Sequence, residues 1–173
     1  MLLGAALALP FAPLSPRLAL AQSGCGAATP ADMEGPFYKA GAPLRASLVE
    51  PGSTAERMVL AGTVRGANCT PFASVSLDFW HADDKGAYDN AGNRYRGIVT
   101  TDALGRYRLE TNLPPPYMGR PRHIHVKLRR PGGKVLTTQL YFPGESRGAD
   151  KALVVKFERR DGLQAASYDF VLF

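Results

Sequence analysis

The fold class follows from two stretches, MVLAGTV at residues 58–64 and SVSLDF at residues 74–79, because apolar residues alternate in them with small or polar ones. A period of two is typical of a strand that covers a core with one face. Further short apolar runs lie at residues 107–109, 124–128, 135–142, 153–157 and 168–173. Turn residues such as DNAGN, PGG and DG separate these runs. The sequence therefore predicts an all-β protein, an antiparallel β-sandwich of about seven or eight short strands.

The composition suits a single globular domain and excludes several other classes of protein. The 173 residues are 45% hydrophobic and 21% charged, which argues against a collagen-like, disordered or multi-domain chain. The 18 glycines and 14 prolines make long helices, and so a helical bundle, unfavourable. The net charge of +6 would suit a nucleic-acid partner. However, the basic residues that cluster at 120–130 have no aromatic residues between them, so we expect no nucleic acid to bind.

The N-terminal part of the chain divides into a leader and an arm. Residues 1–21 carry a single charge, at Arg17, and end on Ala19-Leu20-Ala21, a pattern that export peptidases cleave. We therefore expect an export signal peptide at 1–21 and a periplasmic or secreted protein. The prolines in this stretch leave too short an apolar run for a membrane span, so none is expected. Residues 22–56, rich in Gly, Pro, Ala and Thr, are predicted to form an irregular N-terminal arm, and residues 57–173 the sandwich.

The chain has two cysteines, Cys25 and Cys69. In the oxidising compartment that the leader predicts, they are expected to pair and close a long loop. Two free, buried thiols are the alternative.

The stretch RPRHIHVKL at residues 120–128 is the most informative for function. On a strand, His123 and His125 share one face, while Ile124 and the apolar residues that alternate with it point to the core. The chain has only three histidines. Two of them on one face favour a metal site over a strand that merely presents polar residues to water.

Spacing alone does not identify the other ligands of such a site. Residues 127–130 hold no glutamate, which excludes a cupin site. An iron(II) site with one carboxylate would need an acidic partner, and the nearest, Glu110 and Glu145, show no pattern that links them to the histidines. Zinc with His81 as a third ligand is left open.

Four separated motifs resemble those of the intradiol ring-cleavage dioxygenase family, of protocatechuate 3,4-dioxygenase and catechol 1,2-dioxygenase type. They are DFWHADDKGAY at 78–88, TDALGRY at 101–107, LPPPY at 113–117 and RPRHIH at 120–125, in the family's order and spacing. TPADMEGPFY at 29–38 and LTTQL at 136–140 are also similar to family segments. The resemblance covers residues 29–142 and implies an exported, single-domain member of the family.

The resemblance implies a non-haem iron(III) centre and the residues that bind it. Carried over by position, the ligands are Tyr88, Tyr117, His123 and His125. Two phenolates and a hydroxide would balance the three positive charges of iron(III), and coordination would deprotonate phenols whose ordinary pKa is near 10.

The resemblance also implies the reaction. A catechol ring is cleaved by O2 between its two hydroxyl-bearing carbons, both oxygen atoms enter the product, and a muconate-type diacid results. Tyr117 leaves the iron and takes up a substrate proton, Arg120 stabilises negative charge on the substrate ring, and Gln139 lies on the oxygen-binding side. The identity of the catechol, and a homo- or hetero-oligomeric assembly, are left open.

A non-catalytic binding module is the competing interpretation. Residues 60–79 and 101–109 also resemble prealbumin-like and carboxypeptidase regulatory-like β-sandwiches. Those modules lack the set of two tyrosines and a His-x-His pair, and this set separates the two interpretations.

Overall fold

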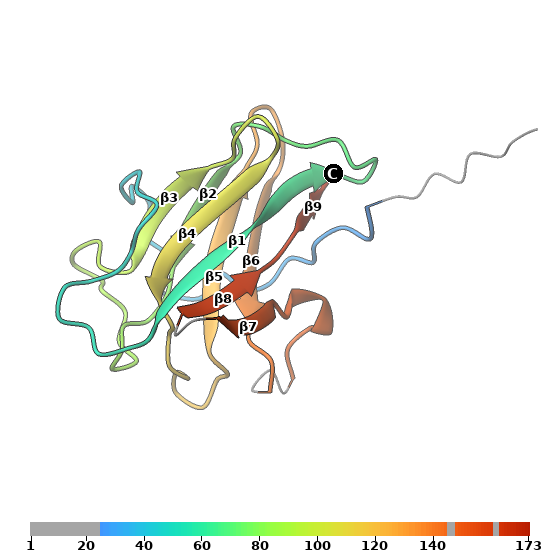
Figure 1. The fold of residues 1–173 in the computed structure, drawn as a ribbon. Helices are drawn as coiled ribbons and strands as arrows, with labels where there is room; N and C mark the ends of the chain where they lie inside the picture. Colours follow the sequence, from blue (N-terminus) through green and yellow to red (C-terminus); the bar gives the residue numbers. More distant parts are fainter. Residues whose placement is uncertain (1–24, 145–147, 161–162) are drawn as a thin grey trace, which may run out of the picture.

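The computed structural model describes residues 25–144, 148–160 and 163–173, so the predicted signal peptide at 1–21 lies outside the described residues. No helix in these ranges is long and apolar enough to cross a membrane. The chain folds into two sheets that pack face to face, with an N-terminal arm, blue in Figure 1, that crosses one of them.

Nine strands make up the two sheets in the described residues. One sheet consists of β2 (Ser76–Trp80), β3 (Arg96–Thr100), β5 (His123–Arg129) and β6 (Val135–Tyr141). Its order is β3-β2-β5-β6, with antiparallel pairing throughout. The other sheet consists of β1 (Arg57–Gly66), β4 (Arg106–Asn112), β7 (Lys156–Arg160), β8 (Leu163–Ser167) and β9 (Phe170–Leu172). Its order is β4-β1-β8-β7, and β9 also pairs with β1.

The predicted all-β sandwich is confirmed, with differences in detail. β3 and β8 were not expected, because RGIVT and LQAAS lack a clear alternation of large apolar residues. The strand predicted at 153–157 is partly wrong, since a 3-10 turn, η1 (Lys151–Leu153), comes first and β7 begins only at Lys156. The pairing is not purely antiparallel either, because β8 and β9 both run parallel to β1.

β1 is long enough to pair with β8 and β9 one after the other. Residues 58–61 pair with β8 and residues 64–66 pair with β9. Between these two segments Tyr168 lies beside β1, and its amide donates a hydrogen bond to the carbonyl of Ala61 (3.0 Å). A Cβ on Gly62 would lie 1.8 Å from the carbonyl oxygen of Tyr168, so only glycine fits at this position.

The hydrophobic core lies between the two sheets. Ile124, Val126 and Leu128 of β5 point into it and are fully buried, as the alternation in the sequence predicts. They meet core residues from the facing sheet such as Leu60 and Leu109. Because the odd-numbered residues of β5 point away from this core, His123 and His125 lie on the outer face of their sheet.

The N-terminal arm is irregular, as predicted, but it closes one side of the sandwich. The amide of Arg45 donates to the carbonyl of Ile98 on edge strand β3 (3.0 Å), and the amide of Leu48 donates to Glu110 on edge strand β4 (2.7 Å). Both edge strands therefore have backbone partners, which removes two exposed sheet edges. The Leu48 side chain also joins the core.

Cys25 and Cys69 form a disulfide, with Cα atoms 5.0 Å apart. This confirms the predicted pairing and excludes two free thiols. The disulfide ties the start of the described arm to the turn that follows β1.

Candidate active site

The paired strands β5 and β6 present four polar or aromatic side chains on the outer face of their sheet. His123 is directly opposite Tyr141, and His125 is directly opposite Gln139. Residues two apart on a strand share a face, so the register brings all four side chains together. This face is not wet, since none of the four residues is more than 4% exposed.

The N-terminal arm is what buries this outer face. The Asp32 amide donates to the carbonyl of Thr137 on β6 (3.0 Å). Gly35 then passes directly over His125, where an added Cβ would lie 3.4 Å from the ring carbon Cε1. Two residues later the ring of Phe37 stacks on that of Tyr88, with centroids 4.5 Å apart. The site thus lies between the sheet and the arm, outside the main hydrophobic core.

Three of the four predicted metal ligands direct their donor atoms at one point. The hydroxyl oxygen of Tyr88 lies 3.1 Å from Nε2 of His123 and 3.1 Å from Nε2 of His125. Nδ1 of His123 is 2.7 Å from the carbonyl oxygen of Pro121. A carbonyl can only accept, so Nδ1 carries the proton and the Nε2 lone pair faces Tyr88.

The environment of the two histidines keeps both rings neutral. Burial lowers the pKa of His125 to about 2, helped by the nearby His123 ring, which would repel a second protonated imidazole, and by the positive charge of Arg120. Burial likewise lowers the pKa of His123. Trp80 stacks on the His125 ring, with centroids 4.8 Å apart and ring planes 6° from parallel, which fixes its orientation. Neutral imidazole is the form that binds a metal ion.

Tyr117, the fourth predicted ligand, is brought beside the same group by a tight turn. Its ring meets that of Tyr88 edge to face, with centroids 5.3 Å apart. Tyr117 and Arg120 exchange backbone hydrogen bonds of 3.1 and 2.7 Å. Met118 and Gly119 between them both have positive φ, +43° and +77°. This is the conformation of a two-residue hairpin turn, and it holds Tyr117 and Arg120 next to each other.

The predicted catalytic residues Arg120 and Gln139 are also brought together. Nη2 of Arg120 donates to Oε1 of Gln139 (2.8 Å), and Nη1 lies 3.5 Å from Nε2 of His123. Nε2 of Gln139 donates to the carbonyl of Met33 in the arm (2.7 Å). Gln139 is fully buried on the site face, so it is not a solvent-facing strand residue.

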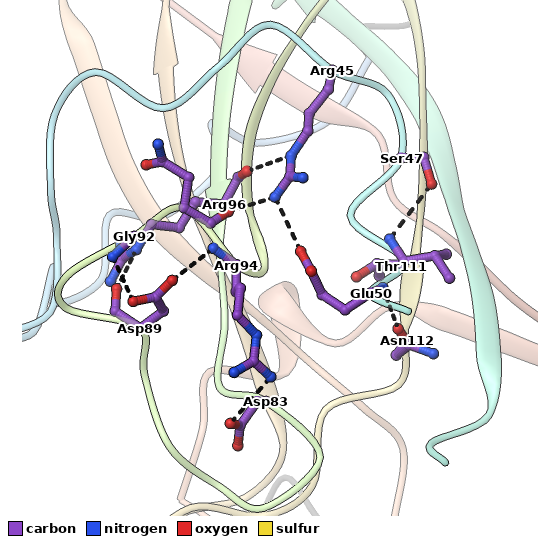
Figure 2. Close-up of polar contacts among 12 residues, drawn as sticks. Arg45, Ser47, Glu50, Asp83, Asp89, Gly92, Arg94, Arg96, Thr111 and Asn112 are labelled. Carbon is purple, nitrogen blue, oxygen red and sulfur yellow. Dashed lines mark hydrogen bonds and ion pairs between the residues drawn. The ribbon is translucent and has the colours of Figure 1, made fainter. Parts of the chain in front are cut away.

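Tyr88 lies in the loop between β2 and β3, and polar contacts hold that loop in shape (Figure 2). Asp83 accepts hydrogen bonds from the amides of Lys85 and Ala87 (2.9 and 2.8 Å), just before Tyr88. Asp89, just after it, accepts from three amides, including that of Arg94 (2.9 Å). Asx turns of this kind fix a loop without a core of its own.

Arg96, at the start of β3, supports the loop that carries Tyr88. It is 2% exposed, and its Nε donates to the carbonyl of Asp89 (2.9 Å). Arg45 of the arm donates in turn to the carbonyl of Arg96 (2.9 Å) and pairs with Glu50, as Figure 2 shows. Sequence reasoning identified residues 89–93 as a turn but missed Asp83, Asp89 and Arg96 as supports of Tyr88.

Within the described residues, neither His81 nor Glu110 completes a metal site with the histidine pair. Both ring nitrogens of His81 are occupied, Nδ1 by the carbonyl of Ala82 and Nε2 by Oγ1 of Thr111, each at 2.7 Å. Glu110 pairs with Arg108 on β4, away from the histidines. Glu145 lies outside the described residues. No three His, Cys, Asp or Glu side chains of the described chain cluster to hold a metal, so the converging donors are two imidazoles and phenols.

Comparisons with known proteins identify the family of this chain. A family model described as dioxygenase matches residues 33–172. The chlorocatechol 1,2-dioxygenase of Pseudomonas sp. (strain P51) is 31% identical, over 81% of this chain and 68% of that enzyme.

Two solved structures have the same fold. One is the dioxygenase domain of a dioxygenase carbohydrate-binding protein fusion from Streptomyces sp. SirexAA-E, with 44% identity and a TM-score of 0.81 over 84% of this chain and 98% of that domain. The other is the chlorocatechol 1,2-dioxygenase of Pseudomonas putida, with 30% identity and a TM-score of 0.75 over 83% of this chain and 71% of that one. These matches favour an enzyme over a non-catalytic binding sandwich. The chain belongs to the intradiol ring-cleavage dioxygenase family and is an oxidoreductase of that type.

Proposed function

We propose that the protein is a non-haem iron(III) enzyme that uses O2 to cleave a catechol between its two hydroxyl-bearing carbons, giving a muconate-type diacid. The observation that carries this proposal is the convergence of the Tyr88 hydroxyl with Nε2 of both His123 and His125, each at 3.1 Å. The family and its catechol-cleaving relatives support the substrate class and the reaction.

The donor set fits a hard, highly charged cation. Imidazole nitrogen suits iron, and phenolate oxygen is a hard, anionic donor that suits its ferric state. Burial raises the pKa of Tyr88 above its ordinary value, so the free phenol keeps its proton. A trivalent cation beside the oxygen would supply the opposite charge that favours the phenolate. Tyr88 and Tyr117 would together offset two of the three positive charges.

Bound iron(III) would supply Lewis acidity toward the catecholate and the electron exchange that makes its ring react with O2. The residues around it have separate tasks. Tyr88, Tyr117, His123 and His125 would hold the metal, and the phenolate oxygen of Tyr117 would accept a proton from a catechol hydroxyl. Phe37 over Tyr88 and Trp80 over His125 exclude water from one side of the site.

Arg120 and Gln139 act on the substrate. The guanidinium of Arg120 is held beside the histidines by its hydrogen bond to Gln139. A fixed cation there stabilises negative charge that develops on the catechol ring. Because Gln139 is held by the arm carbonyl of Met33, the pair is in position before substrate arrives.

The test is spectroscopic and catalytic. Protein loaded with iron(III) should be red-brown from tyrosinate-to-iron charge transfer and should consume O2 with catechol, forming a diacid that absorbs in the ultraviolet. Tyr88→Phe and His125→Ala should lose both the colour and the turnover. Tyr107→Phe is the matched control, because its hydroxyl bonds to the carbonyl of Tyr168 within the sandwich (2.9 Å) and not to the site. Wild-type protein that stays colourless after ferric loading would refute the proposal.

Export to the periplasm or the medium is a second part of the proposal. It is supported by the leader pattern at 1–21 and by the Cys25–Cys69 disulfide, which an oxidising compartment preserves. Fractionation of cells that express the full chain, with N-terminal sequencing, should find mature protein that begins at Gln22 outside the cytoplasm. Protein that keeps Met1 in the cytoplasm would argue against it.

A further inference from the structure

We propose that Asp32 and Tyr141 are positioning residues for ring cleavage, which hold Arg120 and Gln139 in place beside the histidine pair. This inference rests on the proposed function. Neither residue is a predicted ligand or catalytic group, and they lie 109 residues apart in the sequence.

The contacts form a chain from the arm to Arg120. The Tyr141 hydroxyl lies 2.8 Å from Oδ2 of Asp32 and 3.3 Å from Oε1 of Gln139. It has one hydrogen, and the shorter contact to a charged carboxylate takes it. The lone pairs of the hydroxyl then face Nη2 of Arg120, which donates to it at 3.3 Å. The same Nη2 group donates to Gln139 at 2.8 Å.

Tyr141 is held in the state that this chain of bonds needs. Its side chain is buried, and its hydroxyl lies 2.8 Å from the Asp32 carboxylate, which can only accept, so the hydroxyl donates. Asp32 is itself fixed, because its backbone amide donates to Thr137 (3.0 Å) and its Oδ1 accepts from the amide of Met33 (2.7 Å). The carboxylate is therefore a rigid acceptor at the end of this series of hydrogen bonds.

The arm supports both partners of Arg120 with consecutive residues. Asp32 accepts from Tyr141, and the carbonyl of Met33 accepts from Gln139 (2.7 Å). Arg120 lies at the end of a tight turn and has a long, flexible side chain. Without these acceptors its guanidinium would sample several rotamers, and a misplaced cation stabilises developing charge poorly. The arm segment at 32–33 is thus part of the catalytic apparatus as well as a cover for it.

Tyr141→Phe and Asp32→Asn test this role in the iron-loaded full chain. Tyr141→Phe removes both the acceptor for Arg120 and the donor to Asp32, and it should lower kcat for catechol about 10- to 100-fold. Iron content and the tyrosinate absorption band should stay at the wild-type level, which a merely structural defect would not allow. Asp32→Asn keeps the shape but removes the charge, and it should lower kcat by a smaller factor. If Tyr141→Phe does not fold, an unchanged kcat in Asp32→Asn overturns the proposal.

Thr138→Val is the matched control. Thr138 is the neighbour of Gln139, and its Oγ1 donates to the arm carbonyl of Pro30 (2.8 Å). Among the residues that the structure describes, no hydrogen bond links Thr138 to Arg120. This change weakens the contact between the arm and β6, so it should lower the melting temperature. The hydrogen bonds that hold Arg120 stay intact, so kcat should stay within about twofold. A drop in kcat equal to that of Tyr141→Phe would mean that loosening of the arm, and not positioning, explains the loss.

A double-mutant comparison identifies the residue through which Tyr141 acts. In an Arg120→Gln background, Tyr141→Phe should cause little further loss of kcat, since there is no guanidinium left to position. The same fold loss in both backgrounds would overturn the proposal. An anaerobic spectral titration with 4-nitrocatechol adds a readout without turnover, in which we expect weaker binding to Tyr141→Phe and unchanged binding to Thr138→Val. Failure of the wild type itself to turn over catechol would count against the proposed function, whereas wild-type turnover with an unaffected Tyr141→Phe counts against this inference alone.

Discussion

Arg96→Met should weaken iron binding although Arg96 is not a predicted ligand. Its Nε donates to the carbonyl of Asp89 (2.9 Å), the residue directly after Tyr88. A hydrogen bond from a charged group contributes about 1.5–3 kcal/mol. Since 1.4 kcal/mol corresponds to a factor of ten, a loop released from this bond should bind iron(III) about 10- to 100-fold more weakly.

The loss of overall stability from Arg96→Met should be smaller than the loss of iron affinity. Nη2 of Arg96 is buried without a partner in the part of the chain that the structure describes. Removing the guanidinium therefore also removes the cost of burying an unsatisfied donor, which offsets part of the lost hydrogen bond.

The assay is a competition titration in which citrate and the protein share iron(III), followed by the tyrosinate absorption band. Arg94→Met is the matched control, because it removes the same charge two residues away (Figure 2). The Arg94 side chain is 55% exposed and pairs with Asp83 at only 3.8 Å, so its loss should change the affinity little. Equal iron affinities for Arg96→Met, Arg94→Met and the wild type would refute this account of the Tyr88 loop.

Three further changes test the fold. Replacing Cys25 and Cys69 with serine should lower the free energy of unfolding in urea by about 4 kcal/mol, because the disulfide joins residues 44 apart, and a change below 1 kcal/mol would contradict this. Gly62→Ala should lower the melting temperature and cost about 3 kcal/mol, since its Cβ would meet the Tyr168 carbonyl, and an unchanged melting temperature would mean that the chain shifts freely there. Burial holds the pKa of His81 at about 4, so the unfolded chain binds more protons between pH 6.5 and pH 4 and stability falls as the pH falls through that range. Between pH 7 and pH 4, the free energy of unfolding in urea should fall by about 3 kcal/mol more for the metal-free wild type than for His81→Gln. Equal decreases would contradict the lowered pKa of His81.

The sequence predicts what depends on local periodicity and misses what depends on distant contacts. The alternation at 120–128 correctly separates His123 and His125 from the core side chains, because a period of two fixes which face each residue occupies. The same reasoning applied to β6 would have found Tyr141, which lies two residues beyond Gln139 and directly opposite His123. No local pattern announces its partner Asp32, because the arm reaches β6 only through tertiary folding.

The location of the site explains why the arm would matter for the proposed function. The space between the sheets is filled by apolar side chains, so charged and polar groups that must be desolvated need a buried region outside this core. The arm creates that buried region by covering the outer face of β5. Lys127, on the same face as the histidines, is 8% exposed and forms an ion pair with Glu34 of the arm, while its ammonium lies 3.6 Å from the ring centroid of Tyr38. Buried cations of this kind are stable only while their partners stay in place.

The arm is fixed on both sides of the segment that covers the site. The disulfide at Cys25 lies before this segment, and the backbone bonds of residues 43–48 to both edge strands follow it. Between these anchors, Asp32, Met33 and Gly35 keep their own contacts with β5 and β6. Reduction of the disulfide should therefore lower global stability first and leave the geometry at Arg120 intact in the folded fraction. Substitutions at Asp32 or Tyr141 should do the reverse, so thermal stability and kcat should vary independently across these two groups of variants.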